Sequence, residues 1–248
     1  MHFFVNAFNI ILYQPLFNAL LLLYEYLPGH DFGVAVIILT ILTKIILYPL
    51  GTQGIKSQKA LQELQPKIKE IQEKLKNEKE KQARAMLELY KKEKINPFSG
   101  IVPLLVQIPI LIALFRVLQK GFVGEYHQLL YGFVPYSGHI NTFFLGLVNL
   151  GEASVILTLL TGLAQFIQTK MVIPKQKSVP TGSADFSGMM QKQMLYFFPI
   201  FTVFILWRLP SAIALYWLTT TLFTIGQQYI ILKKKKNDPV RSLSQKNF

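Results

Sequence analysis

Five apolar stretches alternate with polar segments along the chain. They cover residues 32–51, 101–119, 153–173, 192–207 and 212–232. A helix needs about 20 predominantly apolar residues to cross a bilayer, and these stretches approach or reach that length. The pattern therefore predicts an all-α integral membrane protein, built as a five-span helical bundle.

The segment before the first predicted span, residues 3–27, is apolar but interrupted. Its polar side chains project onto about half of a helical wheel, and Pro15 lies in its middle. This pattern favours an N-terminal amphipathic helix that lies in the membrane interface. The alternative is a sixth span, because the segment is also long enough to cross the bilayer.

Residues 54–96 form a polar segment that contains twelve Lys or Arg and seven Glu. Apolar residues recur in it at spacings of three and four, the pattern of a coiled-coil seam. They are Leu61, Leu64, Ile68, Ile71 and Leu75. The spacing predicts a helical hairpin of two antiparallel helices, roughly 20 and 16 residues long, with its turn near Asn77. Pro66 should kink the first helix or mark its start.

The net charge of +13 is distributed unevenly. Lys and Arg concentrate in residues 54–98, 170–192 and 233–246, whereas residues 1–31 and 121–152 contain none. Cytoplasmic loops of membrane proteins carry such an excess, so the N-terminus is predicted outside and the C-terminus in the cytoplasm. The predicted parts are an extracytoplasmic interfacial helix, a first span, a cytoplasmic hairpin, spans two to five and a basic cytoplasmic tail, at residues 1–31, 32–53, 54–98, 99–232 and 233–248.

The composition, 51% hydrophobic with a mean hydropathy of +0.34, is typical of a membrane protein. The absence of cysteine excludes disulfides, thiolate catalysis and cysteine metal sites. The sequence contains no P-loop, dinucleotide-binding or His-Glu-x-x-His motif, and its four histidines lack the spacing of a metal site. We therefore expect no enzymatic activity, no cofactor and no metal. No secretory signal or transit peptide is evident, which favours a bacterial plasma membrane.

One full charge, Lys44, lies inside the first predicted span. A lysine deep in a membrane helix costs about 2.5–3.5 kcal/mol and normally faces a bundle interior or a hydrated cavity. The alternative is that Lys44 extends its ammonium to the interface, roughly 12 Å away along the helix. Thr40 lies one turn earlier on the same face, so that face is polar at two levels.

Further polar side chains occur in other predicted spans. Gln107, Gln165, Tyr216 and Trp217 are the main ones. Each one alone is explained by packing or by an interhelical hydrogen bond, which contributes about 0.6 kcal/mol on average. Taken together with Lys44, they fit a polar cavity that shelters a cation.

Short motifs occur through the chain in a fixed order. They are Tyr13 to Asn18, Pro28 to Asp31, Thr40 to Leu50, Leu61 to Pro66, Leu89 to Lys91, Asn96 to Pro109 with its spaced prolines, Phe198-Pro199, and Pro210 to Trp217. In combination they resemble the YidC/Oxa/Alb family of membrane protein insertases, and the resemblance spans nearly the whole chain.

The resemblance implies a function, the insertion and folding of hydrophobic segments of newly made membrane proteins. Family members hold a hydrophilic groove that is open to the cytoplasm and to lipid and closed on the outside. Lys44 matches the cation that draws the acidic or polar N-terminal part of a substrate into this groove. The other expected substrate-binding groove residues are Thr40, Gln107, Gln165, Tyr216 and Trp217.

The resemblance also implies partners. The hairpin of residues 54–96 is the expected mobile element that receives substrate. The basic cluster Lys233, Lys234, Lys235 and Lys236 is expected to contact the ribosome or anionic lipid. Nascent membrane proteins, membrane lipids, the ribosome and the Sec translocon are therefore the expected partners.

The chain departs from the family pattern in three ways. Bacterial members mostly have arginine where this chain has Lys44, which keeps the charge but loses the bidentate fork. The large outer domain of many Gram-negative members has no counterpart here. Neither the N-terminal span nor the lipoprotein cysteine of other members is found.

Two other functions fit the same residues. A small channel or transporter for an anionic solute is one, because Lys44 inside the membrane could bind an anion, although no internal repeat of the transporter kind is evident. A structural membrane scaffold that uses the hairpin as a docking element is the other.

Overall fold

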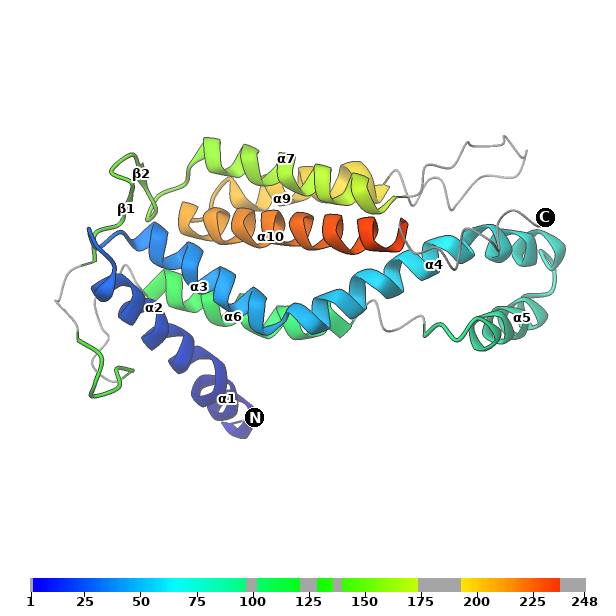
Figure 1. Cartoon of the computed structure of the whole chain (residues 1–248), viewed down its shortest axis with the longest axis horizontal. Coiled ribbons are helices and arrows are strands. Elements are labelled where there is room, and N and C mark those ends of the chain that lie inside the picture. Colours follow the sequence, from blue (N-terminus) through cyan, green and yellow to red (C-terminus); the bar gives the residue numbers. More distant parts are fainter. Residues whose placement is uncertain (1, 97–101, 121–128, 136–139, 174–192, 237–248) are drawn as a thin grey trace.

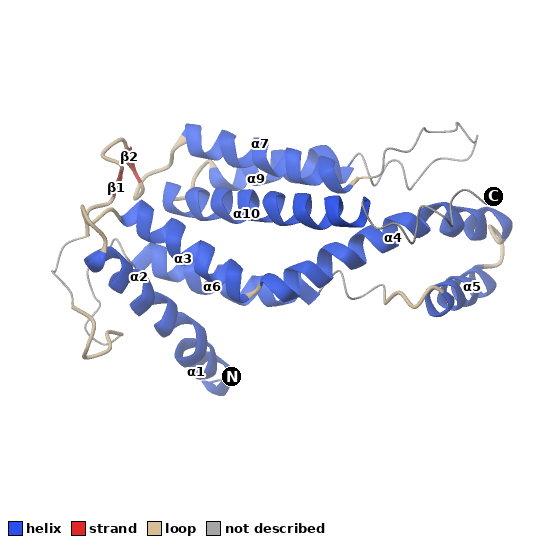
Figure 2. Ribbon diagram, viewed as in Figure 1, coloured by secondary structure: helices blue, strands red, loops and turns tan. Residues whose placement is uncertain are grey.

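The structure is a computed structural model that describes residues 2–96, 102–120, 129–135, 140–173 and 193–236. The predicted loop at 174–190 and the end of the basic tail, residues 237–248, lie outside the described residues. The described part is mainly helical, in agreement with the predicted all-α class (Figure 2).

Helices of different lengths form a bundle, and a helical hairpin extends from one end of it (Figure 1). The helices are α1 (His2–Phe8), α2 (Gln14–Tyr26), α3 (Phe32–Ile46), α4 (Tyr48–Lys74), α5 (Lys79–Lys92), α6 (Val102–Lys120), α7 (Val155–Val172), α9 (Phe198–Leu206) and α10 (Ser211–Lys236), with π-helical turns η1 (Asn9–Tyr13) and η3 (Gln193–Phe197). Two short antiparallel strands, β1 (Phe143–Phe144) and β2 (Val148–Asn149), lie before α7, with Phe143 opposite Asn149.

The second to fifth predicted spans correspond to α6, α7, η3 with α9, and α10. Most of the predicted ends lie within a few residues of the observed helix ends. One boundary differs clearly. The last helix is predicted to end at about residue 232, but α10 continues to Lys236, so the whole basic cluster Lys233 to Lys236 lies within the helix. The small β1–β2 hairpin was not predicted, because strands of two residues leave no periodicity to detect.

The apolar stretch at residues 32–51 is divided at Leu47. Helix α3 ends just before it and α4 begins just after it, with a bend of 68° between the two. Leu47 has φ −84° and ψ 2°, which lies outside the α-helical region. Pro49 follows in the first turn of α4, where its missing N–H interrupts the helical ladder but its ring is tolerated.

The hairpin consists of α4, which has 27 residues, and α5, which has 14. The pattern of charged and apolar residues predicts a shorter first helix, because that pattern starts after the apolar stretch, whereas α4 already begins within the stretch. Pro66 lies inside α4 and does not mark its start. Lys67 Nζ and Glu93 Oε1, 2.5 Å apart, join the two helices in an ion pair. Hydrogen bonding and the charge of Lys67 hold the pKa of the Glu93 carboxyl below its ordinary value.

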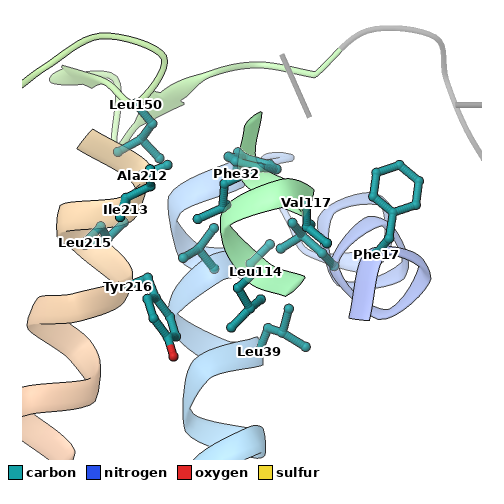
Figure 3. Packing of buried hydrophobic residues seen from close by; sticks show 14 of the residues in the cluster. Phe17, Phe32, Leu39, Leu114, Val117, Leu150, Ala212, Ile213, Leu215 and Tyr216 are labelled. Atoms are coloured by element: carbon teal, nitrogen blue, oxygen red, sulfur yellow. The ribbon is translucent and has the colours of Figure 1, made fainter. Parts of the chain in front are cut away.

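The hydrophobic core lies where α2, α3, α6 and α10 converge with residues 129–135 and 140–152 (Figure 3). We call this region the loop end of the bundle, and it includes the first turns of α3, α7 and α10. Phe17 of α2, Phe32 of α3, Val117 of α6 and Leu150 are each 1% exposed or less. The opposite region, where α3 ends, α4 begins and α10 finishes, is called the hairpin end.

Asn18 of α2 fastens the segment 129–131 to the bundle. Its Nδ2 donates to the Gln14 carbonyl and to the Leu129 carbonyl, each at 2.8 Å, and its Oδ1 accepts from Tyr131 N at 2.8 Å. Gln14 Nε2 donates to the same Leu129 carbonyl at 3.2 Å. Asn18 is 1% exposed, so backbone groups of the loop supply the partners that a buried amide requires.

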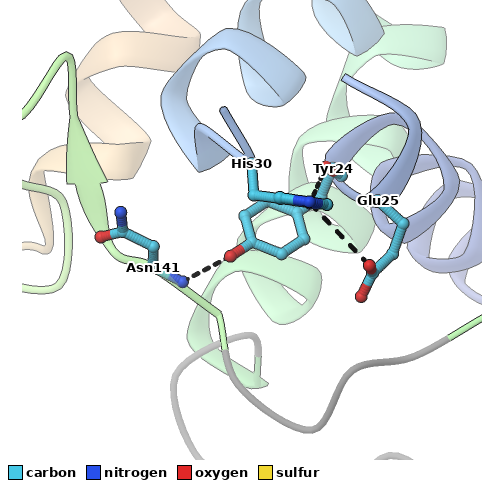
Figure 4. Close-up of polar contacts among 4 residues, drawn as sticks. All are labelled: Tyr24, Glu25, His30 and Asn141. Carbon is cyan, nitrogen blue, oxygen red and sulfur yellow. Dashed lines mark hydrogen bonds and ion pairs between the residues drawn. The ribbon is translucent and has the colours of Figure 1, made fainter. Parts of the chain in front are cut away.

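Tyr24 fastens a second part of the loop (Figure 4). Its hydroxyl accepts from Asn141 N at 2.7 Å. His30 packs its ring 5.7 Å from the Tyr24 ring and lies 3.9 Å from the Glu25 carboxylate. Tyr24 therefore holds the end of α2 against the backbone at Asn141, and His30 packs beside it.

Asp31 joins the start of α3 to the β1–β2 turn. Its Oδ1 accepts from Val34 N at 2.9 Å as an N-cap, and its Oδ2 accepts from Leu145 N at 2.6 Å. Gly33 follows in the first turn of α3, and a Cβ on it would lie only 2.3 Å from the Phe144 ring. The absence of a side chain at Gly33 thus allows β1 to pack directly on α3.

The start of α10 is fastened to the same loop. Ser211 N donates to the Glu152 carbonyl at 2.7 Å, and Ala212 N donates to the Leu150 carbonyl at 3.1 Å. Ser211 Oγ also donates to the Asn149 carbonyl at 3.0 Å. Two N–H groups at the start of α10 therefore have partners without a capping side chain.

One helical segment, Val5–Tyr26, is by itself long and apolar enough to cross a membrane within the described residues. The bent pair α3–α4 meets the same test only when taken together, and Leu105–Leu118, Val155–Met171 and Leu195–Leu206 are shorter apolar helices. The predicted count of five spans and the interfacial position of residues 3–27 both stay predictions.

Candidate functional site

Lys44 lies in the last turn of α3, three residues before the break at Leu47. Its side chain is half-buried, while the neighbouring Ile45 and Ile46 are 55% and 75% exposed. Among the residues that the structure describes, Lys44 has no hydrogen bond or ion pair. A cation in this setting is available to an acidic group that comes from outside the chain.

Thr40 lies one turn before Lys44 and is only 1% exposed. Its hydroxyl donates to the Val36 carbonyl of the same helix at 2.6 Å. Thr43 does the same to the Leu39 carbonyl at 2.8 Å. The Thr40 hydroxyl therefore serves its own helix, and it makes no hydrogen bond to Lys44 within the described residues.

Gln107 and Tyr216 form a pair between α6 and α10. Gln107 Nε2 donates to Tyr216 Oη at 2.6 Å, and Tyr216 is 4% exposed. Gln107 lies two residues before Pro109, which removes one backbone hydrogen bond from α6 without ending the helix. This pair is a cross-helix contact between two of the predicted site residues.

Gln165 and Trp217 form a second pair, between α7 and α10. Gln165 Oε1 accepts from Trp217 Nε1 at 3.0 Å and from Thr202 Oγ1 of α9 at 3.3 Å. The close approach of α7 and α9 is made possible by Gly162, where a Cβ would lie 2.4 Å from Val203. A single amide oxygen thus joins three helices.

The predicted site residues fall into three places. Tyr216 and Trp217 are consecutive on α10, so they point in different directions, one to Gln107 and the other to Gln165. Lys44 and Thr40 lie on α3, which packs against α10, but neither is hydrogen-bonded to these pairs within the described residues. Helix α10 is therefore the element that connects the predicted site residues.

Gln227 is a further polar residue that the sequence reasoning did not select. It is 6% exposed, and its Nε2 donates to the Tyr48 carbonyl and to Thr52 Oγ1, each at 3.0 Å. The signal available in the sequence was an amide near the end of an apolar helix. That signal alone does not identify the first turn of α4 as its partner.

One buried polar atom on α10, Gln228 Oε1, has no hydrogen-bond partner among the described residues, and Gln228 is 3% exposed. An unpaired buried polar group costs free energy, so it marks a position where an ordered water would be stabilising. Gln228 lies in the part of α10 that runs from Tyr216 toward the hairpin end.

The basic cluster at the end of α10 is described only in part. Lys233 Nζ lies 5.8 Å from the centre of the Tyr229 ring, a cation–π contact. The side chains of Lys234, Lys235 and Lys236 lie outside the described residues. No group of three or more metal-ligating side chains occurs in the described part of the chain.

Apolar helices joined by buried amides, hydroxyls and an unpaired lysine define a class, the helical membrane proteins with a polar interior. Within this class, the chain belongs to the 60Kd inner membrane protein family, because the model of that family matches residues 22–238. The resemblance inferred from the sequence motifs is thereby confirmed.

Relatives that carry the name membrane protein insertase YidC cover most of the chain. The protein of Fusobacterium nucleatum is 37% identical over 206 residues, which are 82% of this chain and 87% of the relative. Those of Magnetococcus marinus and Geobacter metallireducens are 35% and 33% identical over 85% and 90% of this chain. The chain spans only 34% and 37% of those two longer relatives.

A solved structure has the same fold. It is a crystal structure of an active YidC insertase with its first transmembrane domain resolved, and it is 26% identical to this chain. The TM-score is 0.55, and the match covers 88% of this chain and 46% of that one. The match supports the predicted helical membrane fold, and family membership implies a bacterial inner membrane protein.

Proposed function

We propose that this protein is a membrane protein insertase and chaperone, which inserts hydrophobic segments of newly made membrane proteins and helps them fold. The name that the relatives share supports this function. Lys44 is the single observation that carries it at the level of residues, because a half-buried cation without an acidic partner costs free energy, and an acidic group of a substrate would offset that cost.

In this proposal Lys44 attracts the acidic or polar N-terminal part of a substrate. A carboxylate about 4 Å from the ammonium gains about 4 kcal/mol where the effective dielectric constant is near 20. The cost of a lysine within a membrane helix is about 2.5–3.5 kcal/mol. The two energies are of the same size, so a substrate carboxylate offsets what the unpaired lysine costs.

The pairs on α10 are the proposed polar wall of the substrate groove. Tyr216 and Gln107, and Trp217 and Gln165, keep four polar side chains inside an apolar bundle at little cost, because each pair is hydrogen-bonded. A substrate group replaces or shares these bonds as it passes. Burial of the apolar substrate segment in lipid, at about 25 cal/mol per Å², then drives the transfer without a nucleotide.

The proposed topology places the loop end outside the cell and the hairpin end at the cytoplasm. It is supported by the distribution of Lys and Arg, which concentrate in the hairpin and in the last residues of α10. The hairpin α4–α5 then receives substrate from the cytoplasm. Lys233 to Lys236 face anionic lipid or the ribosome, and the Sec translocon is a further proposed partner.

Insertion by the purified protein in lipid vesicles tests the proposal. The substrate is a single-span reporter with a short acidic N-terminal tail, and the readout is protection of the tail from external protease. We expect insertion above that of protein-free vesicles, retained by Lys44→Arg and lost in Lys44→Glu. Efflux of small anions without reporter insertion would instead show a channel or transporter.

A further inference from the structure

The break between α3 and α4 is held by contacts to α10. Gln227 donates both hydrogens of its amide, one to the Tyr48 carbonyl and one to Thr52 Oγ1. The Tyr48 ring meets Phe223 edge to face, with ring centres 6.5 Å apart and planes at 85°. Amide and ring thus contact the first turn of α4 at two levels of α10.

The close approach at this point depends on Gly51. A Cβ on Gly51 would lie 3.1 Å from the amide nitrogen and oxygen of Gln227. That separation is tighter than ordinary van der Waals contact, so the amide fits because Gly51 carries no side chain. Gln227 is 6% exposed, and an amide so deeply buried must find partners, which the first turn of α4 supplies.

Because of its position, a small change of angle at this contact displaces the distant end of the hairpin by a large distance. Helix α4 continues from the break to Lys74 and extends beyond the bundle with α5 (Figure 1). At about 1.5 Å per residue, the turn of the hairpin lies roughly 40 Å from Tyr48. A change of about 10° at the break therefore moves that turn by about 7 Å. The first turn of α4 is the place where few contacts control a large displacement.

We propose that Gln227 is a positioning residue that clasps the first turn of α4 and sets the direction of the hairpin relative to α10. The clasp is defined by Gln227, Phe223, Tyr48, Gly51 and Thr52. Its consequence for substrate transfer rests on the proposed insertase function, because α10 also carries Tyr216 and Trp217. The clasp then keeps the hairpin aligned with these residues while a substrate passes between them.

The chain offers a matched control for Gln227. Gln228 is the next residue on α10, has the same side chain and is also buried, but it makes no hydrogen bond to α4 within the described residues. Gln227→Leu and Gln228→Leu therefore make the same chemical change on two sides of one helix. Thr52→Val changes the partner on α4 instead. It removes the hydrogen bond from Gln227 to the Thr52 hydroxyl and keeps the shape of the side chain.

Distance measurement between two spin labels tests the clasp in the full chain, reconstituted in lipid without substrate. The chain has no cysteine, so labels at Asn77→Cys, near the hairpin turn, and Leu163→Cys, on the exposed face of α7, report the hairpin direction. A second pair, Ile108→Cys with Ile156→Cys, reports whether the bundle itself stays folded.

In the parent, most molecules should show one main distance between the labels at Asn77→Cys and Leu163→Cys. We expect Gln227→Leu to raise the fraction of molecules with other distances about fivefold or more, and Thr52→Val to raise that fraction less. Gln228→Leu and the bundle pair should stay as in the parent. An unchanged hairpin distance in Gln227→Leu, or equal broadening in both glutamine variants, would overturn the proposal.

In the vesicle assay, Gln227→Leu should insert the reporter several-fold more slowly than Gln228→Leu. A parent protein that inserts nothing refutes the proposed function but leaves the distance result intact.

Discussion

The two ends of the bundle are built on opposite principles. At the loop end, side chains of α2 and the N-cap residue Asp31 bind backbone groups of residues 129–131 and 141–145, and the core beside them is almost completely buried. At the hairpin end, Lys44 has no partner among the described residues and the adjacent isoleucines are exposed. The chain closes one end with satisfied polar groups, whereas the hairpin end combines the satisfied amide of Gln227 with a lysine that has no partner among the described residues.

This difference explains how a small bundle can tolerate polar groups in its interior. Free energy gained by packing and hydrogen bonding at the loop end offsets the cost of the unpaired groups elsewhere. Gln228, with its unpaired oxygen, lies beyond Tyr216 on the way to the hairpin end. A groove that is closed on one side and open on the other is the arrangement that our proposed function requires.

The largest effect is expected for Asn18→Leu, which removes the side chain that fastens the loop. Tyr131 N loses its side-chain partner, and the Leu129 carbonyl keeps only the 3.2 Å bond from Gln14, so we expect a loss of about 3 kcal/mol in the free energy of unfolding. The matched change Gln107→Leu, toward the hairpin end, removes a single bond and should cost about 1 kcal/mol. Denaturant unfolding in mixed micelles measures both, and equal costs would remove the contrast between the two ends.

A smaller effect is expected when a methyl group is added to a glycine. At Gly33 a Cβ would lie 2.3 Å from the Phe144 ring, whereas at Gly226 it would meet nothing within 4 Å. We expect Gly33→Ala to destabilise by about 1–3 kcal/mol and Gly226→Ala to stabilise by about 0.5–1 kcal/mol. The same unfolding assay compares them, and a neutral Gly33→Ala would show that the loop packs less tightly on α3 than the structure indicates.

The smallest effect concerns the exposed ion pair of the hairpin. Lys67 lowers the pKa of Glu93 in the folded protein, so the pair stabilises the hairpin above the ordinary carboxyl pKa. That contribution is lost as the pH falls through the lowered pKa of the folded state. Glu93→Gln should remove this pH dependence and little else, because exposed ion pairs contribute little.

Hydrogen exchange of α5 amides, measured across acidic pH in the parent and in Glu93→Gln, checks this expectation. The parent should lose protection on acidification, and Glu93→Gln should show the lower protection throughout. Identical profiles for the two proteins would show that the pair does not hold the hairpin.

The apolar pattern predicted most helices because long apolar stretches are the strongest local signal. For α6, α7 and α10, most of the predicted helix ends lie within a few residues of the observed ends. It did not predict the break at Leu47, because hydropathy continues unchanged through a bend. Pro49 was a signal for that break, but a proline in the first turn of a helix and one inside a span look alike in sequence.

The candidate site was predictable residue by residue but not as a set of contacts. Lys44 stands out because a charge in an apolar stretch is rare, and its role in binding stays a prediction. The partners of Tyr216 and Trp217 required the structure, since consecutive residues on a helix point to different neighbours. The contact of Gln227 also required the structure, because it joins residues 175 or more positions apart in the sequence.

Reversal of the charge at residue 44 and of the charge on the substrate tail tests the proposed function most directly. Reporters with acidic and with basic N-terminal tails are offered to the parent and to Lys44→Glu in lipid vesicles. If the cation attracts the tail, Lys44→Glu should slow insertion of the acidic-tail reporter about tenfold, and the basic-tail reporter should recover much of that loss. Equal insertion of the two reporters by Lys44→Glu, at the rate of the parent, would contradict an electrostatic role for Lys44.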